Sequence, residues 1–255
     1  MINTLGDHTP EQYYNSLASV YDEMTDWEKR FEKERPHFQK IIHMYNLKTA
    51  LDAGCGTGFH SILLSQLGVK VTAVDISGRM LQQAIKNAAR GKVYIDTVQS
   101  SFQEIGEVVQ NKVDGTFCLG NGIAHVLSED DLQNSFNEFR NILNTGGILF
   151  LQLLNYDSIL KKRERIQHIR RAGEKIFIRF YDYSENSLTF NILVLEKKGE
   201  SYVHSLQSIQ HFPWRFPQIE LCLKQAGFNE VNAYGTMALD PLSKDSSRDL
   251  VVLAS

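Results

Sequence analysis

The order of apolar and polar positions divides the chain into a helical N-terminal part, an α/β part and a β-rich part. Between residues 11 and 45, apolar and aromatic side chains recur at three- and four-residue spacing, as at Tyr14, Leu17 and Tyr21. This spacing predicts amphipathic helix. Pro36 lies in the same stretch. Because proline removes a hydrogen bond from a helix interior, we expect two helices there, or one broken helix.

From residue 48 onward, short apolar runs alternate with helical segments. The runs predicted as strands are TALDAG (49–54), VKVTAVD (69–75), KVYIDTV (92–98), VDGTFCLG (113–120) and ILFLQLL (148–154). The segments 60–68, 77–89 and 128–143 have helical spacing, and Ser77 and Ser128 are suitable N-caps. Such alternation predicts a parallel sheet with helices on both faces.

This rhythm stops after residue 156. We expect a basic helical piece, followed by three alternating runs that form an inserted antiparallel sheet: 175–183, 187–198 and 202–212. A helix over 217–227 and two strands over 228–235 and 249–255 complete the pattern. The sequence therefore predicts one domain, residues 1–255. It carries a helical cap over 1–46 and an antiparallel β lid over 157–212.

Composition excludes several classes of protein. The 255 residues are 42% hydrophobic and 22% charged, as in ordinary globular proteins. A net charge of −3 provides no general attraction to nucleic acid. Three cysteines without metal-ligand spacing argue against a disulfide framework and a zinc site, and they agree with a reducing compartment. We expect no leader peptide, no membrane span and a cytoplasmic location.

The turn after the first predicted strand indicates the ligand. Its three glycines are Gly54, Gly56 and Gly58. A dinucleotide fingerprint would need glycine at Phe59. Asp52 precedes the turn, whose backbone carbonyls can accept from an ammonium group, and Asp75 ends the second strand, where a carboxylate can accept both hydroxyls of a ribose. Ribose, adenine and ammonium without phosphate are the features of S-adenosylmethionine.

The motif from Asp52 to Gly58, the run from Asp75 to Met80 and Asp114 at the fourth strand resemble class I S-adenosylmethionine-dependent methyltransferases. The resemblance implies a Rossmann-like, doubly wound, mostly parallel seven-stranded sheet. It also implies that Asp75 holds the ribose. The other implied cofactor-binding residues lie in the turn or around the adenine: Asp52, Gly54, Cys55, Gly56, Gly58, Ile76, Met80, Ser101 and Phe102.

Two further segments, CLGNGIAHV (118–126) and NYDSIL (155–160), are similar to glycine and glycine/sarcosine N-methyltransferases. This resemblance implies that Leu119, Asn121 and His125 contact the cofactor or the acceptor. The glycine-methylating members carry an arginine just before NYD, where this chain has Leu154. A leucine cannot bind a carboxylate, which argues against glycine or sarcosine as the acceptor.

Methyl transfer from a sulfonium depends mainly on positioning and on the exclusion of water. We expect Asn121 to orient an acceptor N–H and His125 to act as a base for a hydroxyl acceptor, or else to have a structural role. The remaining acceptor-site candidates are aromatic or cationic, with Arg30 placed to meet a carboxylate: Tyr14, Tyr21, Trp27, Arg30 and Tyr156. No residue spacing indicates a metal site.

The leading interpretation is a methyltransferase that acts on a small molecule, with nitrogen as the leading acceptor. The main alternative is a nucleic-acid methyltransferase that docks through the basic segment 161–171, interpreted as a helix. LGNG (119–122) stands where enzymes that methylate exocyclic base amines often carry an Asn/Asp-Pro-Pro-aromatic motif. A cofactor-binding protein without catalysis and a dinucleotide reductase are further alternatives. The sequence leaves open whether the chain is a monomer or a homo-oligomer.

Overall fold

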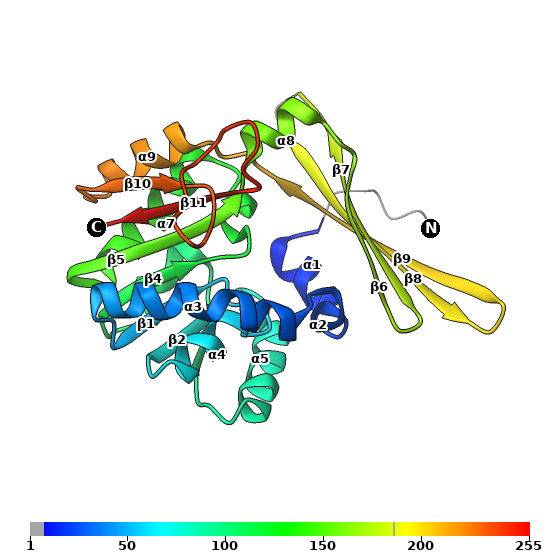
Figure 1. The fold of residues 1–255 in the computed structure, drawn as a ribbon, viewed down its shortest axis with the longest axis horizontal. Helices are drawn as coiled ribbons and strands as arrows, with labels where there is room; N and C mark the ends of the chain where they lie inside the picture. The colour runs from blue at the N-terminus through cyan, green and yellow to red at the C-terminus, as the bar shows by residue number, and fades with distance from the viewer. Residues whose placement is uncertain (1–7, 186) are drawn as a thin grey trace.

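The computed structural model describes residues 8–185 and 187–255. Residues 1–7, which begin the predicted cap and in which no leader is expected, lie outside this range. The chain builds a seven-stranded sheet covered by helices and a separate four-stranded sheet that projects from it (Figure 1). The first helices of the chain lie between the two sheets.

The large sheet contains all the strands predicted for the α/β part. In spatial order they are β10 (Val231–Tyr234), β11 (Asp249–Ala254), β5 (Leu143–Leu154), β4 (Val113–Cys118), β1 (Thr49–Ala53), β2 (Lys70–Asp75) and β3 (Asp96–Gln99). Strand β11 runs antiparallel to both of its neighbours, β10 and β5, and the pairs among β5, β4, β1, β2 and β3 are parallel. Strand β3 is shorter than predicted, because Lys92 adopts a left-handed conformation and Val93 N donates to Ala88 O in the turn that ends the preceding helix.

Strand β1 pairs with β2 on one side and with β4 on the other. The chain order therefore reverses between β1 and β4, which opens a crevice at the carboxyl ends of these strands. Two core clusters cover the two faces of the sheet. Leu51 and Ala53 face one of them, and Ala50 faces the other.

Helices on each face bury an apolar side against these clusters. The longer ones are α4 (Phe59–Gln66), α5 (Gly78–Arg90), α7 (Glu129–Asn141) and α9 (Phe216–Gln225), and the short ones are η1 (Phe102–Glu104), α6 (Ile105–Val108), η2 (Gly122–His125) and α8 (Tyr156–Lys162). Both predicted caps are present. Ser77 Oγ accepts from Met80 N, and Ser128 Oγ accepts from Asp131 N, each at 3.1 Å.

The helical cap consists of α1 (Pro10–Leu17), α2 (Tyr21–Met24) and α3 (Trp27–Tyr45). The expected break at Pro36 is wrong, since α3 runs through this residue. Proline removes one hydrogen bond, whereas Phe38 and Ile41 in the following turn are buried in the core, and this burial keeps the helix in place. The chain breaks instead between residues 18 and 26.

The lid is a four-stranded antiparallel sheet of β6 (Ile166–Ala172), β7 (Lys175–Tyr183), β8 (Leu188–Lys198) and β9 (Ser201–His211). The prediction of three strands preceded by a basic helix is wrong. Helix α8 ends at Lys162, Arg163 adopts a left-handed conformation, and the basic run then pairs with β7. A short run of this kind fits a helix or a strand locally, and pairing with β7 decides between them.

A third core cluster joins the cap, the lid and α5. It contains Tyr13 and Leu17 of α1, Met80 of α5, and Phe177 and Ile192 of the lid. Cap and lid therefore pack as one cover beside the crevice. Within the described residues, no helix has both the length and the apolar character needed to span a membrane.

Candidate active site

A cavity of about 350 Å³ lies at the carboxyl ends of β1, β2 and β4, beneath the cap. The predicted site residues that line it are Tyr14, Tyr21, Trp27, Arg30, Gly54, Cys55, Gly56, Asp75, Ile76, Ser101, Phe102, Leu119 and His125. The wall also contains residues that the sequence analysis did not select, among them Thr25, Phe59, His60, Gln103 and Asp131. The predicted residues Asp52, Gly58, Met80, Asn121, Leu154 and Tyr156 lie outside this wall.

The glycine turn packs closely against its surroundings. A Cβ at Gly54 would lie 3.2 Å from Cζ of Phe102, so the aromatic ring covers this part of the turn. Gly58 has φ +87°, and its Cβ would lie 2.9 Å from Cβ of Ala84 in α5. Gly54 therefore contributes to the cavity wall, whereas Gly58 allows α4 and α5 to approach each other.

Asp75 ends β2 with both carboxylate oxygens held by the backbone. Oδ2 accepts from Gly56 N and Oδ1 accepts from Ser77 N, each at 2.8 Å. Burial raises the pKa of Asp75 to about 6, although these two hydrogen bonds oppose the shift. Because an ionised carboxylate has about four acceptor positions, each oxygen can still accept one hydroxyl from the cavity.

Asp52 lies behind the turn. Its Oδ2 accepts from Ser61 Oγ at 2.5 Å, so the carboxylate ties β1 to α4. Burial raises its pKa. Met80 is likewise displaced from its expected place beside the adenine, because its side chain is fully buried in the third core cluster between α5, cap and lid.

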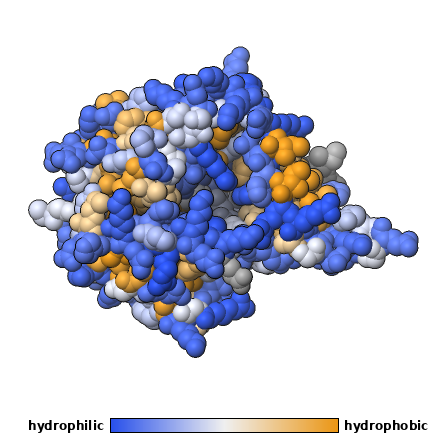
Figure 2. Space-filling view, in the orientation of Figure 1, coloured by the Kyte–Doolittle hydropathy of each residue, from blue (hydrophilic) through white to orange (hydrophobic). Residues whose placement is uncertain are grey.

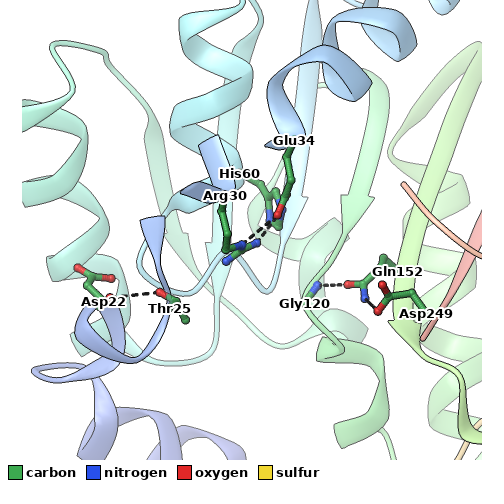
Figure 3. A network of polar contacts seen from close by, with 8 residues as sticks. All are labelled: Asp22, Thr25, Arg30, Glu34, His60, Gly120, Gln152 and Asp249. Atoms are coloured by element: carbon green, nitrogen blue, oxygen red, sulfur yellow. Dashed lines mark hydrogen bonds and ion pairs between the residues drawn. The ribbon is translucent and has the colours of Figure 1, made fainter. Parts of the chain in front are cut away.

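The cap presents Arg30 at the cavity wall through a network with Glu34 and His60 (Figure 3). Arg30 Nε donates to Glu34 Oε1 at 2.9 Å, and His60 Nε2 lies 2.9 Å from Glu34 Oε2. Burial raises the pKa of Glu34, but the contacts with His60 and Arg30 outweigh it and lower the pKa to about 2. The Arg30 guanidinium also lies 3.9 Å from the ring centroid of Phe59. The i,i+4 spacing of Arg30 and Glu34 was visible in the sequence, whereas the contact with His60 was not.

His125 lies in the cavity wall, where its imidazole is a candidate general base. Its Nε2 lies 2.7 Å from the Tyr14 hydroxyl, and its buried Nδ1 has no hydrogen-bond partner in the part of the chain that the structure describes. Burial lowers the pKa of His125 to about 4, so the imidazole is neutral at physiological pH. The ring of His211, which sequence reasoning did not single out, lies at a centroid distance of 4.6 Å.

Asn121, Leu154 and Tyr156 form a layer behind this wall. Asn121 Nδ2 donates to the Tyr156 hydroxyl at 3.0 Å, and Leu154 N donates to Asn121 Oδ1 at 2.9 Å. Both the NH2 group and the carbonyl oxygen of the Asn121 amide are therefore hydrogen-bonded within the protein. Burial raises the pKa of Tyr156 to about 12, and its hydroxyl lies 3.3 Å from His211 Nδ1. The Tyr156 hydroxyl thus connects this layer with His211.

A second chain of polar contacts fixes the loop after β4. Gly120 N donates to Gln152 Oε1 at 2.7 Å, and Gln152 Nε2 donates to Asp249 Oδ1 at 2.8 Å (Figure 3). These bonds join the loop to β5 and β11. Among the described residues, no group of three or more His, Cys, Asp or Glu could hold a metal ion.

The basic segment 161–171 does not form the helix that was considered for nucleic-acid docking. Three of its cations lie in ion pairs: Lys161 with Asp245 at 2.7 Å, Arg165 with Asp182 at 2.8 Å, and Arg170 with Asp26 at 3.0 Å. The charges that would contact phosphates are partly neutralised within the protein.

Comparisons with known proteins agree with this geometry. The family model described as a methyltransferase domain matches residues 50–147. A glycine/sarcosine N-methyltransferase of Aphanothece halophytica is 31% identical over 90% of this chain and 84% of its own. A corresponding enzyme of Halorhodospira halochloris is 28% identical over 90% and 83%.

Solved structures show the same fold. An S-adenosylmethionine-dependent methyltransferase from Clostridium acetobutylicum ATCC 824 superposes with a TM-score of 0.81 at 19% identity, over 95% of this chain and 98% of that one. The chain has the predicted glycine turn and a crevice at the strand ends, and it matches these relatives over almost its whole length. It therefore belongs to the S-adenosylmethionine-dependent methyltransferases, in the branch of the glycine/sarcosine N-methyltransferases.

Proposed function

We propose that this methyltransferase transfers the methyl group of S-adenosylmethionine to the nitrogen of a small amine. The observation that carries the proposal is a neutral histidine, His125, in the wall of the cavity and hydrogen-bonded to Tyr14. The relatives named as glycine/sarcosine N-methyltransferases support the same chemistry.

The cavity has the groups that the cofactor needs. Asp75 provides two fixed carboxylate oxygens for the ribose hydroxyls. Ile76, Ser101, Phe102 and Leu119 form a largely apolar wall for the adenine. When bound, S-adenosylmethionine supplies a methyl group on a positively charged sulfur, which a nitrogen lone pair can displace in line.

An amine is protonated at neutral pH and has no free lone pair in that state. Burial raises the pKa of Tyr14 well above its usual value, so its hydroxyl is intact. In our proposal this hydroxyl takes a proton from the amine while it passes its own proton to Nε2 of His125, 2.7 Å away. The lowered pKa of His125 means that the imidazole accepts a proton only transiently and is neutral again for the next turnover.

The cap completes the acceptor side. Tyr21, Trp27 and Arg30 line the cavity from α2 and α3 and limit the access of water. Asn121 and Tyr156 act indirectly in this proposal, by holding the loop and the histidine layer in place. Positioning and water exclusion then contribute most of the rate.

The test uses S-adenosylmethionine labelled in its methyl group. Purified protein is incubated with separate pools of small amines and amino acids, of hydroxylated aromatic compounds, and of bulk tRNA. We expect label in an N-methylated small amine. Label found only in hydroxylated compounds, or only in tRNA, would refute transfer to an amine nitrogen.

A further inference from the structure

Arg179 of the lid has an unusual environment. It lies on β7 between Phe177 and Tyr181, which are both fully buried. Since side chains alternate along a strand, these three residues share the inner face of the lid. Ile192, the partner of Arg179 on β8, is also buried on this face. The half-buried guanidinium therefore sits among side chains that pack against the cap.

Within residues 8–185 and 187–255, the side chain of Arg179 makes no hydrogen bond or ion pair. Burial lowers its pKa, Arg248 lowers it further, and the hydroxyls of Tyr21 and Tyr13 raise it. None of these groups carries a negative charge at neutral pH. A buried charge without a counter-ion is costly, and proteins usually pair such groups.

Two other cations of the lid, Arg170 and Lys175, are paired with the cap. Arg170 Nη1 lies 3.0 Å from Asp26 Oδ2, and Lys175 Nζ lies 2.7 Å from Glu23 Oε1. These pairs join the lid to α2 and to the start of α3. Arg179 has no such partner among the described residues, so its charge is left for a group from outside the described chain.

A set of hydroxyls connects Arg179 with the cavity. Tyr13 OH is buried and has no hydrogen-bond partner in the described chain. The Tyr13 ring lies 5.2 Å from that of Tyr14 and 6.5 Å from that of His125, measured between centroids. Tyr21 lines the cavity directly, and the positive charge of Arg179 acts to lower the pKa of its hydroxyl. Tyr14 and Tyr21 also pack against the core cluster that contains Tyr13 and Phe177, so these tyrosines connect the inner face of the lid with the wall of the cavity.

We propose that Arg179, with the hydroxyls of Tyr13 and Tyr21, binds an anionic group of the methyl acceptor. The enzyme would then select small amines that carry a carboxylate or a phosphate. This inference rests on the proposed function and adds the substrate class to it. Leu154, at the end of β5, packs against the core and supplies no charge.

The first test measures binding without turnover. Melting temperatures are recorded with saturating S-adenosylhomocysteine and increasing acetate or inorganic phosphate, at constant ionic strength. We compare the wild type with Arg179→Met and with the control Arg171→Met, which changes an exposed arginine on the outer face of β6. The wild type and the control should gain about 3 °C near saturation. An equal gain in Arg179→Met would overturn the proposal.

The second test separates charge recognition from folding. Methyl transfer is measured for matched pairs: glycine and glycinamide, β-alanine and its amide, phosphoethanolamine and ethanolamine. Arg179→Met should raise KM for the preferred anionic acceptor by about 10- to 100-fold and change kcat little. The neutral member should be unaffected, and Arg179→Lys should recover part of the loss. The pair whose anionic member is methylated best shows whether the site binds a carboxylate or a phosphate.

Equal losses for both members of a pair would indicate a structural role and refute anion recognition. N-methylation that ignores the anionic group and Arg179 would also refute it, while the proposed function would stand. If no amine is methylated, the proposed function fails, and the melting experiment still decides whether Arg179 forms an anion site.

Discussion

The two halves of the cavity differ in how they are built. The cofactor half lies at the ends of β1 and β2 and consists of a continuous motif, with Asp75 held by the backbone N–H groups of Gly56 and Ser77. The acceptor half of the wall is assembled from α1, α2, α3 and the loop after β4, which are far apart in the sequence, and the lid packs against α1 behind it. On the face shown in Figure 2, the projecting lid carries an apolar patch beside charged side chains. One part of the site is therefore determined by local sequence, and the other depends on packing between distant segments.

The largest effect is expected in the acceptor half. Replacing His125 by Gln keeps a polar side chain of similar size but removes the proton acceptor next to Tyr14. We expect kcat to fall by about 100- to 10,000-fold, with the affinity for S-adenosylmethionine little changed. Single-turnover rates and calorimetric titration measure the two quantities separately. A variant with wild-type kcat would show that this half does not remove the proton through His125.

The same residue should make stability depend on pH. The pKa of His125 is about 4 in the folded protein, against an ordinary value of 6.5. Between these values the unfolded chain binds a proton that the folded protein excludes, so the free energy of unfolding decreases as pH falls from 6.5 to 4. At pH 4 this effect has lowered the free energy of unfolding by about 3 kcal/mol.

Denaturant unfolding of the wild type and His125→Gln at several pH values checks this expectation. The wild type should lose its stability advantage over the variant across this window, and the difference between the two should be constant above it. A difference that is independent of pH from 7 to 4 would mean that the buried imidazole titrates normally.

In the cofactor half, Asp75→Ala should weaken S-adenosylmethionine binding by about 50-fold, because two hydrogen bonds to a charged acceptor are lost. Asp75→Asn keeps one carbonyl oxygen and should lose less. Calorimetric titration provides both values. Unchanged affinity in Asp75→Ala would show that the carboxylate only fixes the turn, through Gly56 and Ser77.

The smallest effect concerns the packing of the glycine turn. Gly58 and Gly68 have almost the same conformation, with φ of +87° and +88°, but a Cβ at Gly58 would meet Ala84 at 2.9 Å. In the described chain, a Cβ at Gly68 meets no atom within 4 Å. Alanine at either position adds backbone strain, and only Gly58→Ala adds the clash. We expect Gly58→Ala to reduce the free energy of unfolding by about 1–2 kcal/mol more than Gly68→Ala.

Combining Gly58→Ala with Ala84→Gly should remove most of this difference, because the clash is relieved while the strain remains. Equal destabilisation by the two alanine substitutions would show that α5 moves freely away from the turn, which would make the cofactor half less rigid than its contacts indicate.

The sequence alone determined the large sheet and the glycine turn after β1. Apolar runs with two-residue periodicity, helical spacing and a glycine turn are local signals, so β1, β2 and the position of Asp75 could be predicted from a few neighbouring residues. The same signals failed where two structures were locally acceptable. Pro36 did not break α3, and the basic run 166–172 became a strand once β7 was available to pair with it.

Only the tertiary structure decided which residues face the acceptor. Met80 and Asn121 were expected in the site but are used in packing and in hydrogen bonds behind the wall. His211 comes from the lid to lie beside His125 without any motif to mark it. The physical reason is that the backbone fixes the direction of a side chain at the end of a sheet strand. In the cap and the lid, the direction of a side chain depends on contacts between distant segments.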